Sequence, residues 1–198
     1  MVFMSLYEYA YYYTLRNEAR KKVADSINNK VKKSGGLHDW NRITLSSIDR
    51  DAIDHARIEW PKHYLRETHN GLRHSWDKLL FRFVPRPSYF DLAVWQQKGD
   101  ERVLQGLALG KPSNGKHHLV VNWVERSYAP TYLKAGILFP VLACAEEYAR
   151  LLGCKRVLIK DPVDPEVYKR YGYEPIQLKK ASGTYLCKEL AHEYDHQS

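Results

Sequence analysis

The sequence predicts an α+β fold in which a central mixed sheet is flanked by helices. Residues 119–159 follow the order strand, turn, helix, strand, which is typical of a unit with two parallel strands. Residues 89–124 contain three strand-like runs joined by a short turn and a longer loop, which predicts an antiparallel meander. Because both units share the strand at 119–124, they belong to one mixed sheet.

The N-terminal part is predicted to be a basic, tyrosine-rich helix. Residues 1–33 have partly helical apolar spacing with seven basic against three acidic residues, and Ser34-Gly35-Gly36 ends the pattern. Five tyrosines between 7 and 13 are too apolar to stay in water, and we expect them to be buried. The helix could dock on the body, pair with a second copy as a homodimer, or lie along nucleic acid.

Short elements precede the meander. A strand at 42–45 is followed by a helix that Ser47 or Asp49 caps and that Pro61 ends, and residues 63–83 predict a second helix or a pair of turns. Trp60, His63, Tyr64 and Trp76 could line an acceptor cleft, although the two tryptophans are more typical of helix packing.

The βαβ unit predicts where a ligand would bind. After the apolar strand at 119–124, a helix ends at Leu152-Gly153, and a second apolar strand follows at 156–159. Pro140 lacks an N–H group and fits only the first helical turn, so the helix should begin no earlier than about Ile137. A ligand crevice is expected at the carboxyl end of the first strand. A last strand at 183–190 precedes a frayed tail.

The composition is that of an ordinary globular chain with a basic balance. The net charge of +8 in 198 residues raises the odds of an acidic partner, including nucleic acid, without selecting one. No run of eighteen apolar residues is present, so we expect no membrane span. The three cysteines form no CxxC pair, which fits a cytoplasmic protein, and Cys144 and Cys154 are predicted to be small core residues.

Two motifs in the second half resemble the GNAT N-acetyltransferase superfamily. Residues 145–154, Ala-Glu-Glu-Tyr-Ala-Arg-Leu-Leu-Gly-Cys, are similar to the family's long helix and its exit. Asp161-Pro162 followed by residues 168–175 is similar to the family's N-P…Y-E-R-x-G-F-x-P pattern. The resemblance covers about residues 42–190. It implies a GNAT domain at 37–191, with the helical extension at 1–36 before it and a tail at 192–198.

The resemblance implies acetyl-CoA as cosubstrate. A pyrophosphate would lie at the helix N-terminus, where backbone N–H groups and the positive dipole end are available. The family's Arg/Gln-x-x-Gly-x-Gly/Ala turn aligns with residues 133–138, but Leu138 replaces the second small residue. Gly136 could therefore be a simple helix cap. The expected cofactor-binding residues are Trp123, Val124, Lys134, Ala135, Gly136, Ile137, Leu138, Asp161, Tyr168 and Arg170.

Acyl transfer to an amine needs a base for the amine and an acid for the leaving thiolate. By the resemblance, Tyr168 is the expected acid. Glu125, directly after the central strand, is the candidate base, acting directly or through water. Tyr171 and Tyr173 occupy apolar places of the pattern and are predicted to be core. The identity of the amine acceptor does not follow from the sequence.

Other functions remain as alternatives. Nine histidines are present, but none has a recognised ligand spacing, so no metal site is expected. A non-catalytic protein of this fold could bind nucleic acid or an acidic protein through its basic surface. A third alternative is an enzyme that modifies nucleic acid, as some phage-type GNAT-like proteins do.

Overall fold

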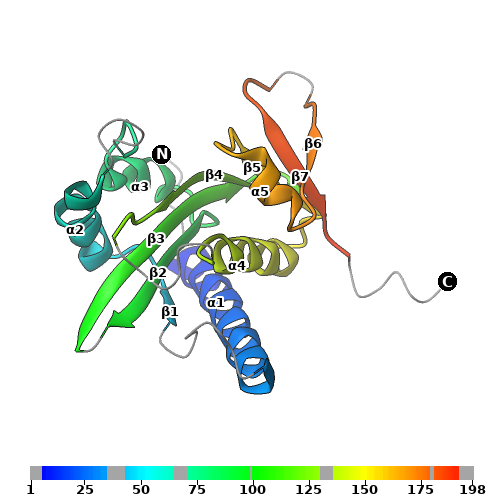
Figure 1. The fold of residues 1–198 in the computed structure, drawn as a ribbon. Coiled ribbons are helices and arrows are strands. Elements are labelled where there is room, and N and C mark those ends of the chain that lie inside the picture. Colours follow the sequence, from blue (N-terminus) through cyan, green and yellow to red (C-terminus); the bar gives the residue numbers. More distant parts are fainter. Residues whose placement is uncertain are drawn as a thin grey trace.

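The computed structural model describes residues 6–34, 43–64, 71–98, 100–129, 136–178 and 181–191. These ranges hold a seven-stranded sheet in the order β1-β2-β3-β4-β5-β7-β6 (Figure 1). The strands are β1 (Ile43–Ser46), β2 (Phe90–Lys98), β3 (Glu101–Pro112), β4 (His118–Arg126), β5 (Arg156–Lys160), β6 (Glu174–Ile176) and β7 (Tyr185–Glu189). The helical elements are α1 (Leu6–Ser34), α2 (Arg50–Ile58), the 3₁₀ helix η2 (Trp60–His63), α3 (Trp76–Phe83), α4 (Leu138–Leu151) and α5 (Pro165–Lys169).

The sheet is mixed, as predicted. Strands β1 to β4 pair antiparallel in chain order, β4 pairs parallel with β5, and β7 pairs antiparallel with both β5 and β6. The predicted mixed sheet flanked by helices is therefore confirmed. The sequence prediction omitted β6, because three residues at a sheet edge are too short to show alternation.

Two hydrophobic cores cover the two faces of the sheet. Helices α1 and α4 lie side by side on one face (Figure 1), over the side chains of Leu92, Ala108 and Val121. Helices α2 and α3 pack on the other face, over Leu107 and Leu109. This alternation along β3 is what a strand buried on both faces requires.

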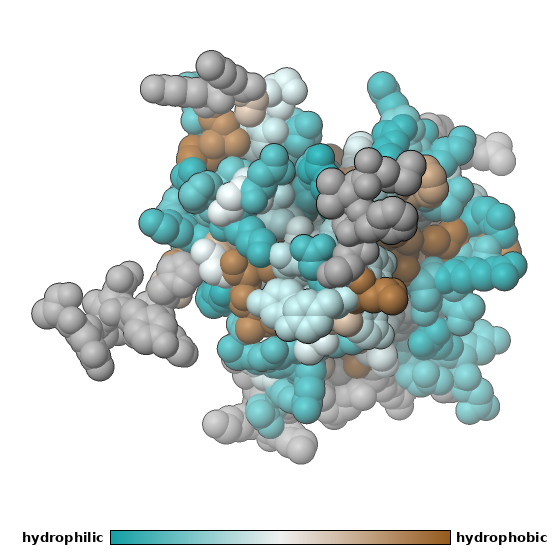
Figure 2. Space-filling model, turned by 180° about the vertical axis from the view of Figure 1, so that it is seen from behind, coloured by the Kyte–Doolittle hydropathy of each residue, from teal (hydrophilic) through white to brown (hydrophobic). Residues whose placement is uncertain are grey.

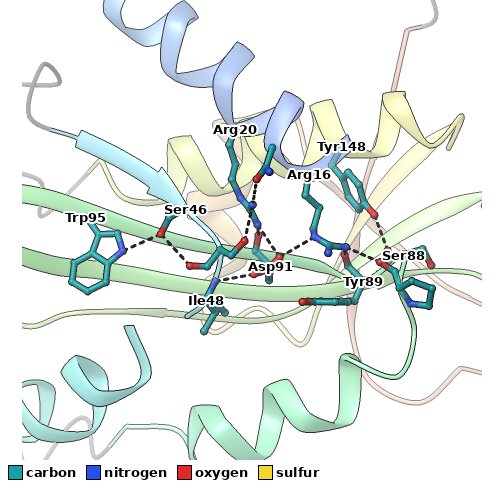
Figure 3. Close-up of polar contacts among 12 residues, drawn as sticks. Arg16, Arg20, Ser46, Ile48, Ser88, Tyr89, Asp91, Trp95 and Tyr148 are labelled. Atoms are coloured by element: carbon teal, nitrogen blue, oxygen red, sulfur yellow. Dashed lines mark hydrogen bonds and ion pairs between the residues drawn. The ribbon is translucent and has the colours of Figure 1, made fainter. Parts of the chain in front are cut away.

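Two arginines of α1 are buried in the protein rather than exposed to solvent (Figure 3). Arg20 donates to Oδ1 of Asp91 at 2.8 Å, and Nε of Arg16 lies 3.3 Å from the same oxygen. Oδ2 of Asp91 accepts the backbone N–H of Ile48 at 2.7 Å. Both arginines lie at helical spacing from the buried Val23 and Ile27, on the face of α1 that is turned toward the sheet. These two charges are consequently not available to nucleic acid.

The expectation that the N-terminal tyrosines are buried is wrong for three of them. Tyr7, Tyr11 and Tyr13 are exposed, by 80 %, 48 % and 49 %. The buried stripe of α1 runs through Val23 and Ile27, and helical spacing carries it back to positions 16 and 12 rather than to these tyrosines. The predicted boundary between an N-terminal extension and the domain stays a prediction, although α1 shares the core with the sheet.

The cysteines, the surface and the helices can be compared with what the composition led us to expect. All three cysteines are free and buried, which confirms the prediction for Cys144 and Cys154. Seen from behind, the described surface is largely hydrophilic and its hydrophobic side chains form separate patches (Figure 2). No helix in the described ranges is both long and apolar enough to cross a bilayer.

Candidate active site

Strands β4 and β5 diverge at the middle of the sheet. Their parallel pairing ends at Val121 and Ile159, whereas β4 continues to Arg126. At the same point the register between β3 and β4 shifts, because Leu109 pairs with Trp123 and Gly110 with Val121. This β-bulge bends β4 away from β5. The two parallel strands thus part at their carboxyl ends, which is where the sequence predicts a ligand crevice.

The bulge residue, Asn122, has an unusual environment. Its Oδ1 atom is buried and has no hydrogen-bond partner in the described part of the chain. Trp123 and Val124 follow it, on the part of β4 that lies beyond the pairing with β5. A buried acceptor and a strand edge without a β5 partner fit a polar, extended ligand lying along β4.

Helix α4 begins close to this crevice. It starts at Leu138, as the position of Pro140 predicted, and Ile137 at its N-cap provides no side-chain hydrogen bond. Ile137 is buried, and a Cβ atom at Gly106 would lie 2.7 Å from its side chain, so this helix end approaches β3 closely. Leu138 packs against the same core. Any ligand contact of these two residues would therefore use their backbone N–H groups.

Glu125 is the buried acid of this site. Glu125 is 5 % exposed, and its carboxylate lies on the face of the sheet that α2 and α3 cover. The indole Nε1–H of Trp76 donates to Oε2 at 2.6 Å, and the hydroxyl of Tyr64 donates to Oε1 at 3.3 Å. Trp60 belongs to the packing core instead, where its indole donates to the carbonyl of Leu104 at 3.2 Å.

The position of Tyr64 depends on a glycine. A Cβ atom at Gly71 would lie 2.7 Å from the Tyr64 hydroxyl oxygen, and Gly71 has a φ of +76°. The ring can lie there only because residue 71 has no side chain. Burial, followed by the charge and hydrogen bond of Glu125, raises the pKa of Tyr64 well above its ordinary value. Tyr64 is therefore a neutral donor to the carboxylate.

Tyr168 lies on the short helix α5, which follows β5. Asp164 caps this helix by accepting the N–H of Glu166 at 3.2 Å, and Pro165 occupies its first turn. The ring of Tyr168 is partly buried against the core and meets Tyr173 edge-on at 6.4 Å. Burial, with a smaller effect from Asp164, raises the pKa of the Tyr168 hydroxyl. Among the described residues this hydroxyl has no hydrogen-bond partner.

The other residues singled out in the sequence differ in burial and in their contacts. Asp161 has a φ of +48°, and its Oδ1 accepts the N–H of Thr184 at 2.8 Å, so its carboxylate holds the start of β7. Arg170 is exposed at the end of α5. Tyr173 is fully buried and donates to Glu146 at 3.2 Å, which confirms it as core. Lys134 and Ala135 lie outside the described residues.

Comparison with known proteins identifies the fold. No family model and no curated protein sequence matches the chain. Solved structures do match. A GNAT-family acetyltransferase from Staphylococcus aureus is 10 % identical with a TM-score of 0.55, over 75 % of this chain and 99 % of that one. The chain has the GNAT fold.

Two further structures agree. A putative acetyltransferase from Salmonella typhimurium, solved with its cofactor acetyl-CoA, is 15 % identical with a TM-score of 0.52 over 80 % of this chain and 98 % of that one. The aminoglycoside 6'-N-acetyltransferase from Enterococcus faecium is 16 % identical with a TM-score of 0.50, over 77 % and 99 %. At these identities the likeness is one of fold, and the resemblance seen in the sequence is confirmed at that level.

Within the GNAT fold, the contacts of Glu125 were not predicted. Tyr64 and Trp76 stood out only as residues that could line a cleft, and no local pattern connects them with an acid 61 and 49 residues later. A polar residue directly after a buried strand was the available signal for Glu125 itself. Among the described residues, no group of three or more His, Cys, Asp or Glu side chains could hold a metal ion.

Proposed function

We propose that this protein is an N-acetyltransferase that moves an acetyl group from acetyl-CoA to an amine. The observation that carries the proposal is the divergence of β4 from β5 after Val121, with the buried carboxylate of Glu125 near the end of β4. The proposal is supported by solved structures of the same fold that are described as acetyltransferases, one of which holds acetyl-CoA.

The chain offers a strand edge and a helix end to such a cosubstrate. Backbone groups of Trp123 and Val124 are suited to bond the amides of the pantetheine arm, as an added strand would. The N–H groups at the start of α4, from Gly136 to Leu138, suit the pyrophosphate. Lys134, Ala135, Asp161 and Arg170 remain proposed contacts. Acetyl-CoA supplies an activated thioester.

Glu125 and Tyr168 have complementary parts in the proposed reaction. Glu125 takes a proton from the amine as the amine attacks, and Tyr168 gives a proton to the sulfur that leaves. The raised pKa of Tyr168 keeps its hydroxyl protonated at neutral pH, which a proton donor requires. Glu125 lies near the end of β4 and Tyr168 follows β5, and the carboxyl ends of these two strands share one edge of the sheet because the strands are parallel.

Substitution of Tyr168 tests this assignment. Tyr168→Phe should lower the rate of acetyl transfer by roughly a hundredfold or more while the affinity for acetyl-CoA stays nearly unchanged, because only the proton donor is lost. Tyr171→Phe is the matched control, since Tyr171 is also partly buried and stacks on Phe139 at 6.5 Å. Equal rates for the two variants would remove Tyr168 from its proposed part.

A further inference from the structure

Glu125 is too deeply buried to meet an acceptor without an intermediary. It is 5 % exposed, Trp76 occupies Oε2 at 2.6 Å, and the hydroxyl of Tyr64 lies 3.3 Å from Oε1. Tyr64 is only partly buried, and the hydroxyl at the end of its ring contacts the carboxylate. A hydroxyl in this position can donate to Glu125 while its oxygen accepts from a group outside.

Packing fixes both donors. The ring of Tyr64 lies against the backbone of Gly71, where any side chain would collide with it. Trp76 is the first residue of α3 and is 5 % exposed within the second core. The three groups come from separate segments of the chain, so their convergence on one carboxylate is a product of the tertiary fold.

The protonation states suit a relay. Burial and the charge of Glu125 raise the pKa of Tyr64, so its hydroxyl keeps its proton at neutral pH and is not itself the base. Tyr128 is a further titratable group near Tyr64, and it also raises the pKa of Tyr64.

We propose that Tyr64 relays the proton of the acceptor amine to Glu125, and that Trp76 is a positioning residue for the carboxylate. This inference rests on the acetyl transfer proposed above. As the lone pair of the amine forms the N–C bond, a proton passes from nitrogen to the Tyr64 oxygen, and the proton of Tyr64 passes to Oε1 of Glu125. Tyr64 is neutral before and after. The C–S bond then breaks, its electron pair stays on sulfur, and Tyr168 protonates the sulfur.

Kinetics of three proteins test the relay. Wild type, Tyr64→Phe and Glu125→Gln are assayed with acetyl-CoA and three amine probes: benzylamine, cadaverine and a lysine-containing peptide. Tyr64→Phe should lower kcat roughly a hundredfold with unchanged affinity for acetyl-CoA, as loss of a proton-transfer group does. A Tyr64→Phe rate equal to wild type, with Glu125→Gln inactive, would overturn the relay alone. A wild type that acetylates none of the probes would contradict the proposed function.

A matched pair of tryptophans tests the positioning part. Trp76→Phe removes a donor that stabilises the ionised carboxylate, so the acid limb of the pH–rate profile should move to higher pH. Trp60→Phe removes an equally buried indole that donates to the Leu104 carbonyl, and it should leave that limb in place. Equal profiles for the two variants would contradict the positioning part.

A spectroscopic measurement judges the same contact without any turnover. In ¹H–¹⁵N spectra the indole Nε1–H signal of Trp76, identified by its loss in Trp76→Phe, should move in Glu125→Gln, whereas the signal of Trp60 should stay. An unmoved Trp76 signal would show that Trp76 does not hold Glu125 in solution.

Discussion

The indole nitrogen of Trp76 lies 2.6 Å from Oε2 of Glu125, which joins the start of α3 to the end of β4. A short hydrogen bond to an ionised group is stronger than one between neutral groups. The helices on this face of the sheet thus do more than cover a core. They hold the buried carboxylate of Glu125, which lies on the part of β4 beyond its pairing with β5.

Glu125→Gln should abolish most of the acetyl transfer without unfolding the protein. The amide keeps an oxygen that can accept the indole N–H of Trp76, but it cannot take a proton from the amine. We expect a rate loss of about 10²- to 10⁴-fold, the usual range for a general base. Glu59→Gln, an exposed acid paired with Lys62 on the same face, should change the rate little. A similar loss in both variants would argue against a special part for Glu125.

Gly71→Ala should slow acetyl transfer while it lowers the stability of the fold only modestly. The new methyl group would displace the Tyr64 ring, and the positive φ adds a conformational cost of about 1 kcal/mol. Gly153→Ala is the control, because Gly153 has nearly the same φ, +75°, and no atom within 4 Å of the added Cβ. Thermal melts should show similar losses of stability for the two variants. Rate assays should show slower acetyl transfer for Gly71→Ala than for Gly153→Ala. Equal rates would show that the placement of Tyr64 is unimportant.

Asp91→Ala should destabilise the protein strongly. Two guanidinium groups would remain buried without their shared carboxylate, and breaking a buried pair in this way costs about 3–5 kcal/mol. Asp54→Ala removes an exposed partner of Arg57 and should cost less than about 1 kcal/mol. Urea unfolding measures both free energies. A small loss for Asp91→Ala would mean that α1 is not held to the sheet by this cluster.

Stability should fall at alkaline pH. Burial raises the pKa of Tyr64, Tyr89, Tyr148 and Tyr173, so the folded state favours their neutral forms. In the unfolded chain these groups ionise near pH 10. The stabilisation is therefore complete below about pH 10 and is lost as pH rises above it. Absorbance of tyrosinate should rise together with loss of the folded circular dichroism signal. Ionisation of all tyrosines in a fully folded protein would contradict this prediction.

The sequence predicted the helices and strands better than it predicted the contacts between side chains that are far apart in the chain. Alternation predicted β2, a continuous apolar run predicted β4, and the lack of an N–H group in Pro140 predicted where α4 begins, because these are local properties. It made no prediction of the burial of Arg16 and Arg20, because their partner Asp91 lies far along the chain. The same holds for the site. Glu125 could be suspected from its position after a strand, but Tyr64 and Trp76 meet it only through the tertiary fold.

The most direct test of the central claim is a calorimetric titration of the wild-type protein with acetyl-CoA. The account predicts saturable binding and a matching rise in melting temperature, because a ligand that binds only the folded state stabilises it. Neither heat nor a thermal shift at about millimolar acetyl-CoA, where a site of this kind would be well occupied, would contradict the claim that the crevice between β4 and β5 is an acetyl-CoA site.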